Sequence, residues 1–214
     1  MATRQRYMEE LEKMNQNVIQ MSTLIEESIG KVIYALKNKD SEVAHKIIED
    51  DDAIDEMERK IEEECIMIIA KQQPLAKDLR RVTSIMRMIS DIERIADHCA
   101  DISEYIILLT QEEKIPMPKQ VEDMLLQMKE MVVAAIDSFV NEDLEKARYV
   151  KKADDIVDDY FDRILKELCT TMEKEPESVR QYAYFIMIIK YIERMADHAT
   201  NMAEWNVYII TGDL

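Results

Sequence analysis

The stretch ERIADHCADISE, residues 93–104, governs the expected fold, because it recurs as ERMADHATNMAE at residues 193–204. Six of the twelve positions are identical, and Glu, Arg, Asp and His are among the six. The second copy begins 100 residues after the first in a chain of 214 residues. This spacing predicts that the chain holds two copies of one structural unit.

Composition favours helices for both copies. The chain has only two glycines, Gly30 and Gly212, whereas an average globular protein contains roughly 7% glycine. Tight β-hairpin turns need residues with positive φ, usually glycine, so a fold built from hairpins is disfavoured. Hydrophobic residues make up 47% of the chain and charged residues 34%, which is enough apolar material for a folded core. We therefore expect an all-α protein.

Sparse helix-breaking residues divide the chain into six expected long helices. The first spans about residues 4–37 and ends at NKDS, the second runs to Gln73 and Pro74, and the third spans about residues 75–113. After the segment KIPMPK, the fourth helix runs to about Val140, the fifth follows a turn at residues 141–143 and runs to about Pro176, and the sixth ends near Thr211.

The prolines of KIPMPK forbid a continuous helix and predict a link between two halves. We place one three-helix bundle in residues 1–114 and the other in residues 115–214. Apolar residues recur every three or four positions along the third and sixth helices, as each helix needs to face a core. The expected fold is thus two tandem three-helix bundles with an internal pseudo-repeat, each about 45 Å long. A coiled-coil or spectrin-like rod is the alternative.

Charge and hydropathy exclude several classes of partner. The formal net charge is −17, which opposes contact with nucleic acid or with an anionic lipid surface. The longest apolar run, residues 65–70, is far shorter than the roughly 20 residues of a membrane span. The first residues also lack the apolar stretch of a signal peptide. We expect no membrane insertion and a cytoplasmic location, with Cys65, Cys99 and Cys169 as reduced thiols in the core.

The repeated stretch forms an acidic stripe when it is placed on a helix. At about 100° per residue, the first copy puts its acidic residues within about 80° of one another, opposite the apolar face. They are Glu93, Asp97, Asp101 and Glu104, and the second copy repeats them as Glu193, Asp197, Asn201 and Glu204. A solvated helix face explains one such stripe. Solubility accepts Lys, Gln or Ser equally well, however, so two matching acidic stripes indicate a specific need for carboxylates.

Stacked carboxylates repel one another along a helix, by a few tenths of a kcal/mol per pair, and a bound cation would reverse this effect. Oxygen ligands suit Mg²⁺, Mn²⁺, Ca²⁺ or iron, and Zn²⁺ also accepts carboxylates. One helix supplies few ligands, so the preceding helix matters. If Pro74 marks the tip of an antiparallel helical hairpin, residues equally far before and after it face each other. This reflection about Pro74 places Asp55 opposite Glu93 and Asp51 opposite Asp97. Reflection about Pro176 places residue 159 opposite residue 193 and residue 155 opposite residue 197.

The acidic segments EDDDAIDEMER (residues 49–59) and KKADDIVDDYFDR (residues 151–163) also align with each other, Asp52 with Asp155 and Asp55 with Asp158. We therefore predict one carboxylate-rich metal site on the outer face of each half, with one ion or more. The candidate ligands are Glu93, Asp97, Asp101, Asp52 and Asp55 in the first half, and Glu193, Asp197, Asn201, Asp155 and Asp158 in the second. His98 and His198 flank the metal, ligate it, contact a partner or the other half, or have a plain surface role.

The doubled E-R-x-A-D-H motif, the acidic segment before each copy and the turn IAKQQPLAKDLRRV (residues 69–82) together resemble the PhoU family of phosphate-transport regulatory proteins. The resemblance covers essentially the whole chain and implies two tandem three-helix bundles. It also implies multinuclear iron or zinc clusters on motifs that fall here on Glu93 and Asp97 and on residues 193 and 197. The family commonly has Asn four residues after the motif Asp. Asp101 departs from this pattern, which argues against equal metal occupancy of the two halves.

The same resemblance implies a regulatory protein without catalytic turnover. Such a protein would act between the ATPase subunit of the phosphate ABC transporter and a sensor histidine kinase, restraining uptake and phosphate-starvation signalling when phosphate is plentiful. We also expect a homodimer. The alternatives are a carboxylate-bridged metalloenzyme and a purely structural helical bundle. Di-iron oxidases, however, direct their ligands into a bundle core, whereas these carboxylates lie opposite the apolar stripe.

Overall fold

The computed structural model describes residues 2–112 and 115–213. These residues form six α-helices and one short 3-10 helix, and they contain no strand, which confirms the all-α prediction. The elements are α1 (Ala2–Asn38), α2 (Ser41–Gln72), α3 (Ala76–Thr110), α4 (Val121–Val140), α5 (Leu144–Lys174), η1 (Pro176–Ser178) and α6 (Val179–Thr211). Within the described residues, no helix combines the length and apolarity that crossing a membrane requires.

The same turn opens the second helix of each half. The Asp40 side chain accepts hydrogen bonds from the backbone N–H groups of residues 42 and 43 and so caps α2. Asp143 caps α5 in the same way. The residue before each cap, Lys39 or Glu142, has a left-handed backbone with φ near 50°, which reverses the chain. The pseudo-repeat therefore extends beyond the acidic motif to the turns that position it.

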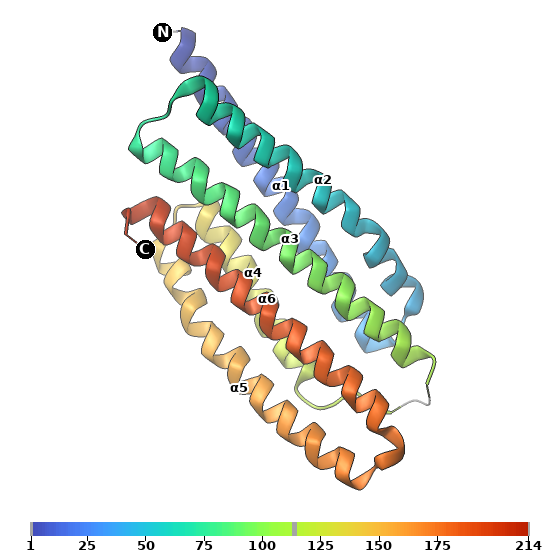
Figure 1. The fold of residues 1–214 in the computed structure, drawn as a ribbon. Coiled ribbons are helices and arrows are strands. Elements are labelled where there is room, and N and C mark those ends of the chain that lie inside the picture. Colours follow the sequence, from blue (N-terminus) through green and yellow to red (C-terminus); the bar gives the residue numbers. More distant parts are fainter. Residues whose placement is uncertain (1, 113–114, 214) are drawn as a thin grey trace.

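The two halves lie along each other. Helices α3 and α6 run side by side and antiparallel through the middle of the molecule (Figure 1). Helix α2 packs against α1 and α3, and α5 packs against α4 and α6. A further contact joins α1 to α4. Each half is the expected three-helix bundle, but the proline link is not the only connection between the bundles, because α3 and α6 pack along their length.

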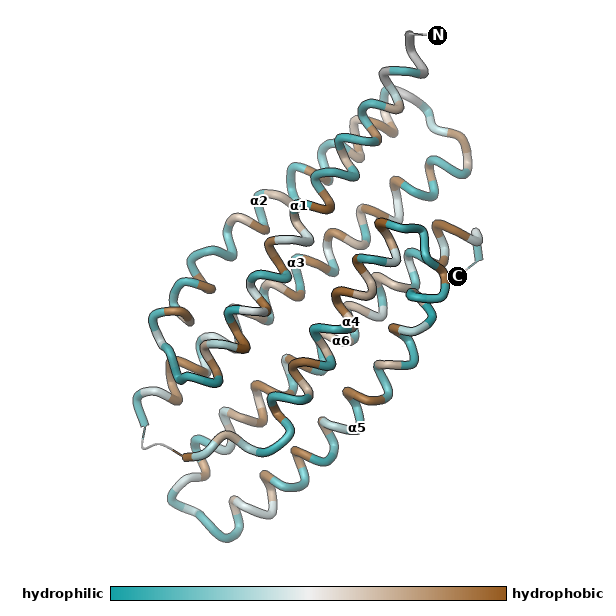
Figure 2. Tube along the Cα trace, turned by 180° about the vertical axis from the view of Figure 1, so that it is seen from behind, coloured by the Kyte–Doolittle hydropathy of each residue, from teal (hydrophilic) through white to brown (hydrophobic). Residues whose placement is uncertain are grey.

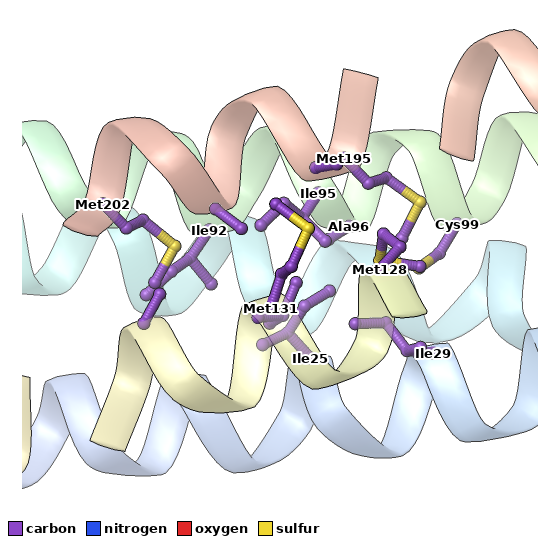
Figure 3. Packing of buried hydrophobic residues seen from close by; sticks show 14 of the residues in the cluster. Ile25, Ile29, Ile92, Ile95, Ala96, Cys99, Met128, Met131, Met195 and Met202 are labelled. Atoms are coloured by element: carbon purple, nitrogen blue, oxygen red, sulfur yellow. The ribbon is translucent and has the colours of Figure 1, made fainter. Parts of the chain in front are cut away.

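The hydrophobic core is continuous between the halves. Figure 2 shows hydrophobic and hydrophilic residues mixed along the helices, as amphipathic helices require. Figure 3 shows side chains from both halves meeting in one cluster. The labelled members come from α1 (Ile25, Ile29), α3 (Ile92, Ile95, Ala96, Cys99), α4 (Met128, Met131) and α6 (Met195, Met202). The expected boundary between residues 114 and 115 borders residues 113–114, which lie outside the described residues, so this division stays a prediction.

The cysteines match the expectation in part. Cys65 and Cys99 are buried free thiols, and burial raises the pKa of Cys65 to about 12. Cys169 is also free but exposed, so its assignment to the core was wrong. The preceding residue, Leu168, occupies the buried position on that turn of α5.

Candidate metal centre

The acidic stripes of α2 and α3 meet on the outer face of the first half. Oxygen atoms of Asp51, Asp55 and Asp97 all lie within 4.8 Å of one another. Among the described residues this is the only group of three acidic, histidine or cysteine side chains that meets this condition. Glu93 lies one turn before Asp97 on α3 and interacts with Asp97 and Asp55. The pairing of α2 with α3 that reflection about Pro74 predicted is therefore present.

Two oxygen atoms of this cluster lack hydrogen-bond partners although they are buried. They are Oδ1 of Asp55 and Oε2 of Glu93. Burial, followed by repulsion from Asp97, raises the pKa of Glu93 to about 7. The same two causes raise the pKa of Asp51 to about 6. Carboxylates in this position hold negative charge only against an electrostatic penalty.

A cation, Arg94, forms ion pairs at the edge of this cluster. Nη1 of Arg94 lies 2.7 Å from Oδ2 of Asp97, and Nε lies 3.4 Å from Oε2 of Glu93. The Arg94 side chain is 57% exposed, and it leaves both buried oxygens without a hydrogen bond. The donor set of three or four carboxylates fits a hard cation such as Mg²⁺, Mn²⁺ or iron, and Zn²⁺ as well. Asp51, Asp55 and Asp97 would hold such an ion, with Glu93 beside them.

A second cluster occupies the equivalent face of α5 and α6, with different surroundings. Burial, followed by repulsion from Asp158 and Asp197, raises the pKa of Asp154 to about 6. Glu193 interacts with both Asp158 and Asp197. Here Nζ of Lys190 lies 2.6 Å from Oε2 of Glu193. This cluster therefore contains a lysine of its own.

Comparison with known proteins assigns the fold and the doubled motif to one family. A sequence model of the PhoU domain matches the chain twice, at residues 18–106 and 121–206. The chain belongs to the PhoU family. A phosphate-specific transport system accessory protein PhoU homolog from Clostridium acetobutylicum is 36% identical over 98% of this chain and 96% of its own length.

Solved structures of the PhoU family have the same fold. The crystal structure of PhoU from Pseudomonas aeruginosa matches with a TM-score of 0.94 and 34% identity, covering 97% of this chain and all of that one. The phosphate transport system regulatory protein PhoU from Streptococcus pneumoniae matches with a TM-score of 0.90 and 32% identity, covering 97% of this chain and 98% of that one. The tandem helical architecture predicted from the PhoU resemblance is thus confirmed.

The candidate ligands of this PhoU family member do not all come together. Glu93, Asp97 and Asp55 lie in the first cluster, and Glu193, Asp197 and Asp158 in the second. Asp52 and Asp155 are exposed. Asp51 and Asp154, the neighbours of these two residues in sequence, are half-buried and belong to the clusters instead. The alignment of the two acidic segments did not select them as ligands. In the second half the reflection was also one residue off, because η1 lengthens the α5–α6 turn.

Asp101 and Asn201 lie on the side of the motif that faces the seam between α3 and α6. Oδ2 of Asp101 lies 3.0 Å from Nδ1 of His98, and Asn201 donates a hydrogen bond to Asp91. Asp91 also lies 2.9 Å from Nδ1 of His198. Because a carboxylate only accepts hydrogen bonds, each Nδ1 carries the proton in these pairs. The histidines thus contact the other half, which is one of the alternatives for them.

The two imidazole rings meet at this seam. Their centroids lie 5.8 Å apart, and the His98 ring also lies 5.3 Å from the ring of Tyr191 on α6. Burial lowers the pKa of His98. The chain has one Glu-x-x-His spacing, from Glu42 to His45 at the start of α2, and both side chains are exposed. Neither arrangement resembles the inward-facing ligand set of a di-iron enzyme.

Proposed function

We propose that this PhoU family member is a metal-binding, non-catalytic adaptor that works in the cytoplasm as a homodimer. It restrains the phosphate ABC transporter through the ATPase subunit and restrains phosphate-starvation signalling through a sensor histidine kinase when phosphate is plentiful. The relatives named as accessory proteins of the phosphate-specific transport system support the pathway.

The arrangement of Asp51, Asp55 and Asp97 carries the metal part of the proposal. Three ligand oxygens from two helices lie within 4.8 Å of one another, and Asp55 keeps a buried oxygen without a donor. A bound divalent ion would supply positive charge to these oxygens and tie α2 to α3. The ions that suit these oxygen ligands include iron, Zn²⁺, Mn²⁺ and Mg²⁺.

Metal content tests this part directly. Elemental analysis of the purified protein is expected to find iron, zinc or manganese, and the metal-free protein is expected to bind added Mn²⁺. Asp97→Asn is expected to abolish binding, because it removes one of three ligands. Asp52→Asn is the matched control, since it removes the same charge from an exposed position. Equal Mn²⁺ binding by wild type and Asp97→Asn would contradict the assignment.

The regulatory part is tested in cells. Removing the gene is expected to raise phosphate uptake and starvation signalling in phosphate-rich medium, and the wild-type gene is expected to restore both. Asp97→Asn is expected to restore them incompletely if the metal holds the docking surface in shape. Pull-down with the purified ATPase subunit checks the contact. Unchanged uptake in the deletion strain would overturn the proposed role.

A further inference from the structure

Next to each acidic cluster, on the side toward the turn of its helical hairpin, lies a pair of residues that differs between the two halves. In the first half this pair is Glu58 on α2 and Ser90 on α3, and the serine hydroxyl donates a 3.2 Å hydrogen bond to Glu58. In the second half the pair is Phe161 on α5 and Lys190 on α6. The ammonium of Lys190 lies 5.5 Å from the centre of the Phe161 ring, within the range of a cation–π interaction.

Lys190 turns from this ring toward the acidic cluster. Its Nζ lies 2.6 Å from Oε2 of Glu193, and its charge also acts on Asp158 and Asp197. The Glu193 side chain is only 18% exposed, whereas the Lys190 side chain is 41% exposed, so the carboxylate is the shielded partner of this ion pair. Position 90, the counterpart of Lys190, carries a neutral serine, and the corresponding face of the first half has an additional carboxylate in Glu58.

The oxygen atoms reflect this difference. In the first half, Asp55 and Glu93 each keep a buried oxygen with no hydrogen-bond partner, despite the nearby Arg94. Among the described residues, no carboxylate of the second cluster has such an oxygen. No three acidic side chains there bring oxygens within 4.8 Å of one another either, whereas Asp51, Asp55 and Asp97 do.

We propose that divalent metal binds only to the cluster of the first half, and that the Lys190 ammonium is the built-in cation of the second cluster and excludes metal from it. This inference rests on the metal centre of the proposed function. An ammonium at hydrogen-bond distance from Glu193 occupies a ligand oxygen and repels an incoming cation. Arg94 makes a comparable contact with Asp97 in the first half, but its side chain is 57% exposed and leaves buried oxygens of Asp55 and Glu93 available to a metal. The first cluster thus keeps two buried oxygens that only an added cation would meet, whereas the second cluster has no such oxygen among the described residues and a lysine paired with Glu193.

Mn²⁺ binding to the metal-free protein tests the proposal, with the unbound ion counted by its paramagnetic resonance signal. Asp97→Asn is expected to remove the bound Mn²⁺, whereas Asp197→Asn is expected to leave it unchanged. Lys190→Ser is expected to raise the bound Mn²⁺ about twofold, because it frees a second set of deprotonated ligands. Adding Asp197→Asn to Lys190→Ser is expected to cancel this gain. Ser90→Lys is expected to abolish binding in the first half.

Two controls separate position from net charge. Lys190→Arg keeps a cation at the cluster and is expected to gain no Mn²⁺. Lys166→Ser removes the same charge from an exposed position of α5 and is expected to gain none. Circular dichroism confirms that each variant is folded.

Three results would overturn the proposal. The first is that Asp97→Asn and Asp197→Asn each remove half of the bound Mn²⁺, and the second is that Lys190→Ser gains none. In either case the metal centre of the proposed function still stands. A wild-type protein that binds no Mn²⁺ at all would overturn that metal centre, and this inference with it.

Discussion

Glu93 lies where burial and the charge of Asp97 raise its pKa to about 7, whereas an unfolded glutamate titrates near 4.3. Between these two values the folded protein binds more protons than the unfolded chain, so stability falls as pH rises. The destabilisation is fully present above about pH 7. Glu93→Gln cannot ionise and is expected to remove this part of the pH dependence. Thermal unfolding of the metal-free protein between pH 5 and pH 8 measures it, and the variant is expected to gain stability relative to wild type as pH rises.

Exposed Glu104 provides the control for this measurement, because Glu104→Gln changes the same type of residue farther along α3. Parallel pH profiles for wild type and Glu93→Gln would contradict the prediction. Added Mn²⁺ is expected to reverse the trend in the wild type, because metal binds the deprotonated carboxylates and its affinity therefore rises with pH.

The residues of the first cluster could be located from the sequence more accurately than those of the second. Reflection about Pro74 paired Asp51 with Asp97 because the α2–α3 turn is short. The same operation about Pro176 missed Asp154, since the sequence gives no sign that η1 shifts the register by one residue. The role of Lys190 was also missed. A signal was present, because position 190 carries a lysine where position 90 carries a serine.

At the scale of single helices, capping predicts measurable stability. Asp40 accepts two backbone hydrogen bonds at the start of α2, at 3.1 Å each, and replacing an N-cap aspartate by alanine typically costs about 1 kcal/mol. We expect Asp40→Ala to lower the free energy of unfolding by about this amount, and Asp143→Ala to do the same for α5. Urea denaturation measures both. Asn also caps helices, so Asp40→Asn is expected to lose much less, and an equal loss for both substitutions would argue against capping.

The sequence predicts these helices well because their breakers are few and strong. The NKDS turn, the two prolines of the link and Gly212 mark ends that the structure places within a few residues of the expected positions. The end of the third helix was placed at residue 113, which lies outside the described residues, and α3 ends at Thr110. Where a helix ends without proline or glycine, no local signal fixes its last turn.

At the scale of the whole molecule, the packing of α3 against α6 could not be predicted from periodicity. An apolar stripe shows that a helix has a buried face, but not which helix covers it. Isoleucines and methionines from both halves fill one cluster (Figure 3). Because side chains such as Ile25 and Met131 share this core, neither half can lose its packing without exposing apolar surface of the other.

The shared core predicts that both halves unfold in one cooperative transition. Trp205 on α6 is the single tryptophan of the chain, so its fluorescence reports on the second half. Ile61 on α2 is fully buried in the first half, and α2 packs against α1 and α3 and not against α6. Ile61→Ala is expected to cost about 2–5 kcal/mol and to lower the urea midpoint seen by Trp205. Ile66→Ala, at a half-exposed position of the same helix, is expected to shift it far less. If the halves unfold independently, the Trp205 transition of Ile61→Ala will stay at the wild-type urea midpoint. Circular dichroism will then show a separate transition of the first half at a lower urea concentration.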